Sequence, residues 1–396
     1  MKQKVIVLFI SFLLFAQNLI TAQSIGINNN GSAPSPSAML DIKSTNKGIL
    51  LPRVNLLNNS DSVTISHPAL SLLVFNTNKN LSGGIGYYSW NGSQWDLVAS
   101  IGNSFVKGKN KYTTLVDGDL REYFVHVPTG YTDTAAVPVV FMLHGKNQSG
   151  ETFYNSIGWN EVSEENTFIA VYPSSWHYCI MDNGQQYSSS RRWNVVPDAD
   201  WTFCAGEVPR DDIKFLKKIL SDLKSKFKID TTRIYLNGFS NGGQMAAKCA
   251  IEMSDVFAAI AENSGSFFKD IVYTPKRKLP LLYEVGNIDY GSGNSGPPTS
   301  LSLLDPLLRT PALLGGTHYG IAHRHINDFG LDSNFTIQGD TNTLMIASYS
   351  SLTGDTLNVF KYIYVNGLGH KYPNGDNHWM DAPHFHWAWL RNYRRL

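Results

Sequence analysis

Hydrophobic and polar residues follow two different patterns along the chain. From residue 121 onward, short apolar runs alternate with longer stretches in which apolar residues recur at helical spacing. The short runs predict strands at 122–127, 137–143, 168–172, 234–237, 281–285 and 360–365. The helical spacing predicts helices at 211–227 and 242–253. Strands separated by helices indicate an α/β fold with a mainly parallel central sheet that helices cover on both faces.

The first hundred residues have another texture. Residues 23–100 are rich in Asn, Ser and Gly, and their apolar runs are short, as at 49–51 and 72–75. Such runs between turn residues predict short strands and a small β-rich N-terminal module. Residues 101–118 carry no apolar periodicity and are expected to be a linker. The α/β domain is therefore expected to occupy residues 119–396.

The extreme N-terminus has the pattern of an export signal. Lys2 and Lys4 precede an apolar run at 5–15, and polar residues then lead to the small residue Ala22. This pattern predicts a signal peptide over residues 1–22. The run is shorter than the ~20 residues that a membrane-spanning helix needs, although a lone membrane anchor is the alternative. We expect a secreted product, extracellular or periplasmic, with no integral membrane segment after signal cleavage.

Composition narrows the range of partners. The chain has 33 Lys and Arg residues against 32 Asp and Glu residues, and the net charge of +1 provides no field that would attract nucleic acid or acidic membranes. Hydrophobic residues make up 42% of the chain, which is enough for a large core. Nucleic acid is therefore not an expected partner.

Three cysteines allow at most one disulfide within the chain. Cys179 and Cys204 flank a polar segment and are the plausible pair, but the sequence leaves open whether they are joined. Cys249 lies in the apolar pattern of a predicted helix and is expected to be a small buried residue.

A candidate nucleophile lies between a predicted strand and a predicted helix. Residues 238–242 read Gly-Phe-Ser-Asn-Gly, and a further glycine follows at 243. Alone, the G-x-S-x-G pattern is weak evidence in a chain with 33 glycines, and a glycine-rich packing turn is the alternative. Its place after an apolar strand and before an amphipathic helix favours the nucleophile elbow of the α/β-hydrolase type, with Ser240 as the nucleophile.

An oxyanion hole is expected from two backbone N–H groups. The N–H of Asn241 lies at the positive end of the helix that follows the serine. The predicted strand at 137–143 runs into His144 and Gly145, and we expect the N–H of Lys146 to be the second donor. Loss of one such donor typically costs ~3–4 kcal/mol of transition-state stabilisation. His144 itself is expected to pack under this loop and to order it.

A serine nucleophile needs a histidine and a carboxylate, and in this fold the chain order is Ser, Asp, His. Asp289 lies just after the predicted strand at 281–285, where the acid belongs. Glu284 lies within that strand and Asp305 lies well beyond it, so both are weaker candidates. His370 follows the last predicted strand through a short glycine-containing loop and is the expected base.

The C-terminal histidines also raise the alternative of a zinc site. His378, His384 and His386 could be ligands, but their spacing fits no H-E-x-x-H motif and no cysteine pairs accompany them. We therefore expect no metal and no organic cofactor.

Residues 121–396 resemble a known group of esterases. This group joins the polyhydroxybutyrate depolymerases with the feruloyl and acetylxylan esterases of carbohydrate esterase family 1. The stretches that carry the resemblance, besides the serine motif, are 121–128, 143–145, 158–160, 171–173, 192–194, 211–213, 229–235, 255–257 and 367–373. The resemblance implies a triad of Ser240, Asp289 and His370.

The sequence departs from this family near the expected substrate face. Lys146 stands where a cysteine is common, and Asn241 stands where a small residue is frequent. A long segment rich in Gly, Pro and Ser, residues 291–310, follows Asp289. These departures concern the identity of the substrate and not the type of reaction.

The N-terminal module has a resemblance of its own. Residues 24–28, 37–53 and 87–95 resemble a module common on exported proteins of the Bacteroidetes, which implies a spacer or attachment element. A surface- or glycan-binding role is the alternative, with Trp90 and Trp95 as candidates for stacking on sugars.

Taken together, the sequence predicts a secreted serine esterase that acts through an acyl-enzyme. The candidate substrates are feruloyl or acetyl esters of plant polysaccharide and polyhydroxyalkanoate-type polyesters, polymeric or small. Trp193, Trp176 and Tyr372 are the aromatic residues expected to line the acyl or sugar subsite. The alternatives are a serine peptidase of the same fold and a catalytically inactive surface- or glycan-binding protein.

Overall fold

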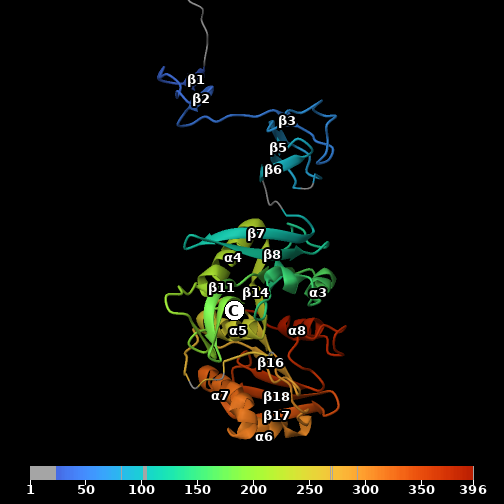
Figure 1. Ribbon diagram of the computed structural model, residues 1–396. Helices are drawn as coiled ribbons and strands as arrows, with labels where there is room; N and C mark the ends of the chain where they lie inside the picture. The colour runs from blue at the N-terminus through green and yellow to red at the C-terminus, as the bar shows by residue number, and fades with distance from the viewer. Residues whose placement is uncertain are drawn as a thin grey trace, which may run out of the picture. The chain divides into compact units, whose positions relative to one another are not determined.

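The computed structural model describes residues 24–81, 83–100, 105–267, 269, 271–291 and 293–395. The predicted signal peptide lies outside the described residues. The chain divides into two compact units, with the first ending at Ala99 and the second running from Ser100 to the C-terminus, apart from a short exchange at 82–85. Figure 1 shows the elements of each unit. Within the described residues, no helix has the length and hydropathy needed to cross a membrane.

The first unit is small and β-rich, as the sequence predicts. Its strands are β1 (Ile25–Asn28), β2 (Leu40–Lys43), β3 (Arg53–Val54), β4 (Leu73–Asn76), β5 (Gly86–Trp90) and β6 (Trp95–Ser100). Strands β1 and β2 form a parallel pair, and β3 to β6 form a four-stranded sheet in chain order. The apolar run at 49–51 forms no strand, and the side chains of Ile49 and Leu50 are exposed.

The two tryptophans of this unit belong to its core. Trp90 is 7% exposed and Trp95 is 0% exposed, and their rings meet edge to face at 5.3 Å. The Nε1–H of Trp95 donates to the backbone oxygen of Asp61 at 2.7 Å. The suggestion that these rings stack on sugars is therefore wrong, because both indole rings are enclosed by the small hydrophobic cluster of the unit.

The prediction of a linker over residues 101–118 is wrong for half of that segment. Residues Gly108–Val116 form strand β7, which pairs antiparallel with β8 (Asp119–Val127). Alternate side chains of β7 are buried, but two of the buried positions are Asn110 and Thr114. Because these two buried residues are polar, the sequence lacks the alternation of apolar and polar residues that predicts a strand, and β7 could not be recognised from it.

The second unit is built on a mixed sheet whose centre is parallel. Within the described residues its strand order is β17-β18-β19-β16-β15-β14-β9-β10-β8-β7. The strands from β19 to β10 pair in parallel, and two antiparallel strands flank them at each edge. The bounds not yet given are β9 (Val137–Leu143), β10 (Ile169–Pro173), β14 (Ile229–Phe239), β15 (Ala259–Asn263), β16 (Leu281–Gly286), β17 (Leu331–Asp340), β18 (Leu344–Ser351) and β19 (Phe360–Val365). The predicted α/β class with a mainly parallel sheet is confirmed.

Helices cover both faces of this sheet. One face carries α4 (Asp212–Lys226), α5 (Asn241–Glu252), α6 (Leu304–Arg309) and α7 (Thr317–Phe329), and the other carries α2 (Gly150–Tyr154), α3 (Trp159–Asn166) and α8 (Ala382–Leu390). Strand β9 contributes side chains to both layers, since Phe141 packs in the first core and Val140 and Met142 pack in the second. Burial on both faces explains why this strand reads as a continuous apolar run.

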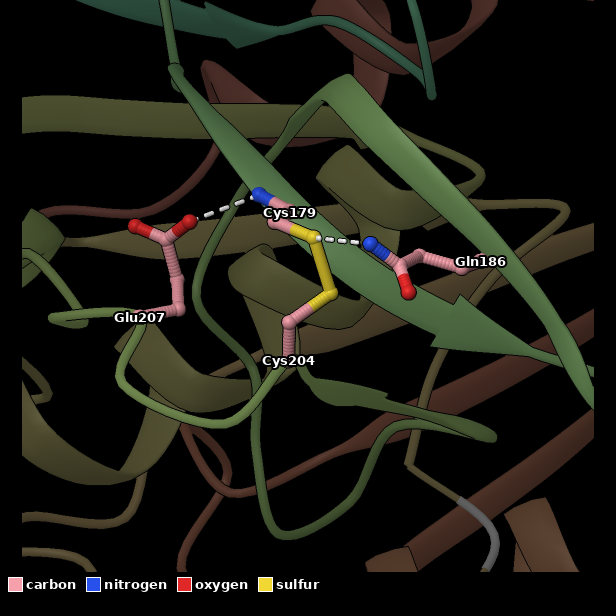
Figure 2. The surroundings of a disulfide bond; sticks show 4 residues. All are labelled: Cys179, Gln186, Cys204 and Glu207. Carbon is pink, nitrogen blue, oxygen red and sulfur yellow. Dashed lines mark hydrogen bonds between the residues drawn. A yellow bond between two sulfur atoms is a disulfide. The ribbon is translucent and has the colours of Figure 1, made fainter.

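A three-stranded excursion leaves the main sheet after β10. Its strands are β11 (Trp176–Asp182), β12 (Gln185–Arg192) and β13 (Trp201–Phe203). A disulfide joins Cys179 on β11 to Cys204 just after β13, as Figure 2 shows. Glu207 adds a second tie, because its Oε2 accepts from the N–H of Cys179 at 2.7 Å. Cys249 is free and buried, as expected.

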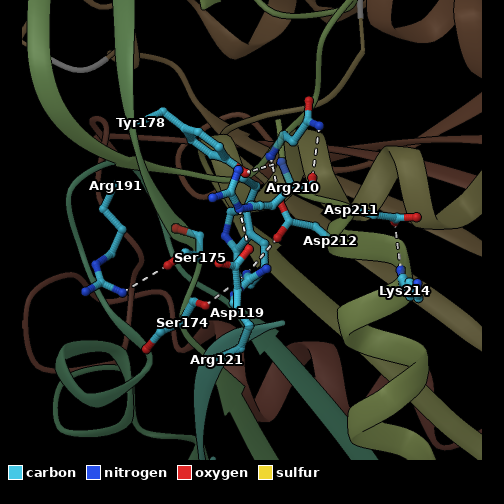
Figure 3. A network of polar contacts seen from close by, with 12 residues as sticks. Asp119, Arg121, Ser174, Ser175, Tyr178, Arg191, Arg210, Asp211, Asp212 and Lys214 are labelled. Carbon is cyan, nitrogen blue, oxygen red and sulfur yellow. Dashed lines mark hydrogen bonds and ion pairs between the residues drawn. The ribbon is translucent and has the colours of Figure 1, made fainter. Parts of the chain in front are cut away.

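A buried ion pair anchors the end of this excursion to the main sheet. Figure 3 shows Arg121 of β8 and Asp212 of α4 pointing toward each other, and the Nη2 of Arg121 lies 2.8 Å from Oδ1 of Asp212. The other carboxylate oxygen of Asp212 accepts from the N–H of Asn194 at 2.7 Å. Arg121 also donates to the backbone oxygen of Ser174 at 3.3 Å. The network therefore ties together β8, α4, the start of the excursion at Ser174 and the loop after β12 at Asn194.

We expect Asp212→Ala to lower the free energy of unfolding of the second unit by ~3–5 kcal/mol, because it leaves the guanidinium of Arg121 buried without its carboxylate. Urea unfolding followed by circular dichroism measures this change. The control is Lys276→Ala, which breaks the half-exposed pair with Asp255 and should cost no more than ~1 kcal/mol. Equal losses in the two variants would contradict an anchoring role for the buried pair.

Candidate active site

Ser240 occupies a strained turn between β14 and α5. Its φ is 54° and its ψ is −120°, a backbone conformation that non-glycine residues rarely adopt. A Cβ on Gly238 would lie 2.1 Å from the backbone oxygen of Gly242, and a Cβ on Gly242 would lie 2.1 Å from the backbone oxygen of Leu143. Only glycine fits at these two positions, which explains the spacing of the motif.

The structure brings Ser240, His370 and Asp289 together at the carboxyl ends of three parallel strands. The Nε2 of His370 lies 2.9 Å from Oγ of Ser240, and its Nδ1 lies 2.9 Å from Oδ1 of Asp289. Asp289 follows β16 and His370 follows β19. A carboxylate can only accept, so Nδ1 carries the proton and the lone pair of Nε2 faces the serine hydroxyl.

Asp289 is held in its ionised form. Burial alone raises the pKa of its carboxyl, but the hydrogen bond and charge of His370, the N–H of Gly291 and the hydroxyl of Ser264 lower it by more. The pKa of Asp289 therefore lies below its ordinary value, and the carboxylate is ionised at neutral pH. An ionised carboxylate keeps the imidazole in the tautomer described above.

The two expected oxyanion donors face the same cavity as the serine. Lys146 and Asn241 both line it, and the backbone N–H of neither residue donates to another described residue. The side chain of Asn241 has a separate task, since its Oδ1 accepts from the N–H of Trp193 at 2.7 Å. This contact gives a structural reason for an amide at a position where the family often has a small residue.

His144 lies under the loop that carries Lys146. Its side chain is fully buried, its Nδ1 donates to the backbone oxygen of Gly145 at 2.7 Å, and its Nε2 accepts from the N–H of Ser175 at 3.0 Å. Burial lowers the pKa of His144 to about 3, so the ring is neutral. It orders the loop, as expected, and lies outside the group formed by Ser240, His370 and Asp289.

The serine opens into a cavity of about 680 Å³ with two unlike walls. The polar wall comes from the excursion and the loop beside it, and includes Lys146, Asp182, Arg192, Asp200 and Trp201. The opposite wall comes from β16, β19, α7 and the loop after Asp289, and includes Tyr283, Tyr290, His318, Ile321 and Tyr364. On the polar wall, Asp182 pairs with Arg192 at 2.6 Å and with Lys146 at 3.4 Å.

The three aromatic residues expected at the substrate subsite are not among the described residues that line this cavity. Trp193 is fully buried and its Nε1–H donates to the backbone oxygen of His144 at 2.9 Å. Tyr372 is 6% exposed and its hydroxyl accepts from Trp159 at 2.7 Å. Trp176 packs against the guanidinium groups of two arginines. Trp193 and Tyr372 are thus buried and Trp176 is half-buried against the arginines, and Trp201 lines the cavity instead.

Glu284, the weaker candidate for the acid, belongs to a buried network beneath the site. Its Oε1 accepts from Asn263 at 2.6 Å, and its Oε2 lies 3.1 Å from Nε2 of His386. The other nitrogen of His386 lies 2.7 Å from Nδ2 of Asn237. These contacts link β14, β15, β16 and α8, so Glu284 has a structural place of its own.

The histidines of the zinc alternative lie in separate surroundings. His378 contacts the backbone oxygen of Asn366, His384 lies 3.0 Å from Glu165, and His386 is buried in the network just described. Across the part of the chain that the structure describes, no group of three or more His, Cys, Asp or Glu side chains could hold a metal ion.

A mainly parallel sheet with a serine on a tight turn between strand and helix defines the α/β-hydrolase class. Residues 121–274 match the family described as "Esterase PHB depolymerase", which confirms over this part of the chain the resemblance seen in the motifs. Residues 26–112 match a second family, described as "Phage tail like trimerisation region".

The curated relatives of the chain are esterases and depolymerases by name. Feruloyl esterase B of Piromyces equi is 30% identical over 173 residues, which are 43% of this chain and 29% of that protein. Poly(3-hydroxyalkanoate) depolymerase C of Paucimonas lemoignei is 26% identical over 271 residues, which are 64% of this chain and 58% of that protein. The chain thus spans less than two thirds of the length of each of these relatives.

Solved structures similar to this one include an acetyl xylan esterase from Aspergillus awamori. The TM-score is 0.46 at 16% identity, and the match covers 71% of this chain and 99% of that chain. In sequence, acetylxylan esterase A of Aspergillus awamori is 22% identical over 273 residues, 64% of this chain and 81% of that protein.

We expect Gly242→Ala to lower the free energy of unfolding of the second unit by at least ~1–3 kcal/mol, because the new Cβ would overlap the backbone oxygens of Leu143 and His144 and push α5 away from β9. Urea unfolding measures the change. Gly48→Ala is the control, since nothing lies within 4 Å of its new Cβ. Unchanged stability in Gly242→Ala would show that the turn can relax.

Proposed function

We propose that the second unit is a serine hydrolase that cleaves carboxylic esters through an acyl-enzyme, and that the chain is exported. The observation that carries this proposal is the position of His370, whose two ring nitrogens each lie 2.9 Å from a partner, Oγ of Ser240 on one side and Oδ1 of Asp289 on the other. This arrangement can remove the proton of a serine hydroxyl and stabilise the imidazolium that results.

In the proposed reaction, Oγ of Ser240 attacks the ester carbonyl while Nε2 of His370 accepts the hydroxyl proton. The N–H groups of Asn241 and Lys146 donate to the oxyanion that forms. His370 then gives its proton to the departing alcohol, which leaves an acyl group on Ser240. Water attacks this acyl group by the same route and releases the acid. None of these steps needs a metal or an organic cofactor.

The proposed substrates follow the names of the relatives. Feruloyl esters, acetyl esters of xylan and poly(3-hydroxyalkanoate) polyesters are all carboxylic esters of hydroxylated chains. A cavity of about 680 Å³ has room for an acyl group together with part of the alcohol. Turnover of methyl ferulate, acetylated xylan and short hydroxybutyrate oligomers, measured side by side, ranks these three classes.

We expect Ser240→Ala to lower kcat/KM for 4-nitrophenyl acetate by at least about 10⁴-fold, because it removes the attacking oxygen. Asp289→Asn should lower kcat by about 10³–10⁴-fold, because an amide cannot hold the imidazole in the required tautomer. Ser266→Ala is the matched control, since it removes another serine hydroxyl from the same cavity. Full activity in Ser240→Ala would refute the assignment.

The same measurements separate this proposal from its rivals. Hydrolysis of peptide amides faster than aryl esters would favour a peptidase of the same fold. An inactive binding protein would show no labelling of Ser240 by an active-serine phosphonate probe.

We propose in addition that the first unit joins three copies of the chain. The match to a trimerisation region covers residues 26–112. At the start of that region, the short β1–β2 sheet and the residue before β2 leave Ile25, Ile27, Met39 and Leu40 each more than half exposed. Apolar side chains gathered on so small a sheet have no core of their own, and a second and third copy would cover them.

We expect light scattering after size exclusion to give the full chain three times its monomer mass. The double variant Ile25→Asn, Ile27→Asn should lower this mass, because it makes the exposed apolar surface of β1 polar. Leu120→Asn is the control, since it changes an equally exposed apolar residue of the second unit. A monomeric full chain would contradict the proposal.

A further inference from the structure

The wall of the cavity opposite the excursion carries a second histidine. His318 lies at the start of α7, beyond the Gly/Pro/Ser-rich segment that follows Asp289, and it lines the same cavity as Ser240 and His370. Its Nδ1 lies 2.5 Å from the hydroxyl of Tyr362, and its ring meets the ring of Tyr364 edge to face at 5.5 Å. These contacts with β19 fix the position of the imidazole.

The protonation state of this pair follows from its surroundings. Burial lowers the pKa of His318 to about 4 and raises the pKa of Tyr362 well above its ordinary value, so both groups are neutral at neutral pH. The side chain of Tyr362 is fully buried, and its hydroxyl has no other hydrogen-bond partner among the described residues. If Nδ1 of His318 donated to this hydroxyl, the phenolic proton would be buried without an acceptor, which costs about 1–3 kcal/mol.

The hydroxyl of Tyr362 therefore donates to Nδ1 of His318, and the remaining ring proton lies on Nε2. In the described part of the chain, no residue accepts from this Nε2–H. Nor is Nε2 among the buried polar atoms that lack a partner, so it stays accessible to an occupant of the cavity. The result is a fixed, neutral donor beside the reacting group.

We propose that His318 forms a binding subsite for an uncharged oxygen of the substrate, a hydroxyl, ether or carbonyl oxygen other than those of the scissile ester. A neutral donor suits such an acceptor, whereas it would not balance the charge of a carboxylate. The negative charge of Asp289 also acts on His318, which further disfavours an anion there. This inference rests on the proposed esterase function, because it names the chemistry that the esterase cavity selects.

The oxygen can belong to the acyl group or to the alcohol, and two ester pairs separate these sources. Methyl ferulate and methyl cinnamate differ in the oxygens of the acyl group. Xylose tetraacetate and cyclohexyl acetate differ in the oxygens of the alcohol.

His318→Phe keeps a planar ring but removes both the proposed donor and the acceptor of Tyr362, and His318→Gln keeps an N–H donor on a flexible chain. Tyr319→Phe, which changes a neighbouring residue of α7 outside the cavity lining, is the matched control.

We expect His318→Phe to lower the ratio of kcat/KM between the oxygen-bearing and the oxygen-free ester about tenfold in one of the two pairs, mainly through KM. His318→Gln should restore part of the ratio, and Tyr319→Phe should leave it at the wild-type value. Unchanged ratios in both pairs for His318→Phe would overturn the proposal.

Binding to the Ser240→Ala protein tests the subsite without turnover. Calorimetry should show tighter binding of the oxygen-bearing ester of that pair, and the added His318→Phe change should abolish this preference. If the wild-type chain hydrolyses no ester but the Ser240→Ala protein shows this His318-dependent preference, the subsite is supported and the proposed esterase function is refuted. A binding preference that survives His318→Phe, or its absence when His318 is present, would overturn the subsite.

Discussion

The close approach of α5 to the ends of β14 and β9 is the constraint on which the candidate site depends. Ser240 keeps a positive φ because the helix begins directly beneath it, and the helix can begin there because Gly238 and Gly242 have no side chains. Strain at one residue persists only where the surrounding structure determines its position. Here the buried strands β14 and β9 fix the position of Ser240. As a result, its hydroxyl lies toward the cavity.

The other parts of the site follow from the order of the strands. Strands β14, β16 and β19 run parallel, so the loops after them reach the same edge of the sheet and bring Ser240, Asp289 and His370 within hydrogen-bond distance. The network of Glu284 and His386 lies beneath these loops and links the strands to α8. The parallel strands and their buried polar ties thus position the reacting groups, whereas the excursion and α7 shape the space in front of them.

The sequence predicts those parts of the fold in which burial is complete on both faces. Strand β9 reads as a continuous apolar run, and β16 and β19 are each interrupted by one charged residue, Glu284 and Lys361, so all three could be recognised. The loops after β16 and β19 could then be searched for an acid and a base. The pattern failed where inward positions are polar, as at Asn110 and Thr114 of β7. It also failed for the cavity lining, because composition cannot tell whether an aromatic side chain such as Trp193 packs inward or faces a substrate. His318 belongs to no motif, and only the packing of α7 against β19 brings it to the cavity.

The disulfide between Cys179 and Cys204 helps to hold the polar wall of the cavity together, and it persists only in some cellular compartments. It closes a segment of the chain that contains Asp182, Arg192 and Trp201, three residues of that wall. Such bonds persist in oxidising compartments and are rare where glutathione and thioredoxin keep thiols reduced. Ser240, Asp289 and His370 lie outside the closed segment, whereas Trp193, which donates to Asn241 and to the backbone oxygen of His144, lies within it. The polar wall is therefore held by a covalent bond that an oxidising compartment preserves, whereas the three reacting groups lie on loops of the main sheet.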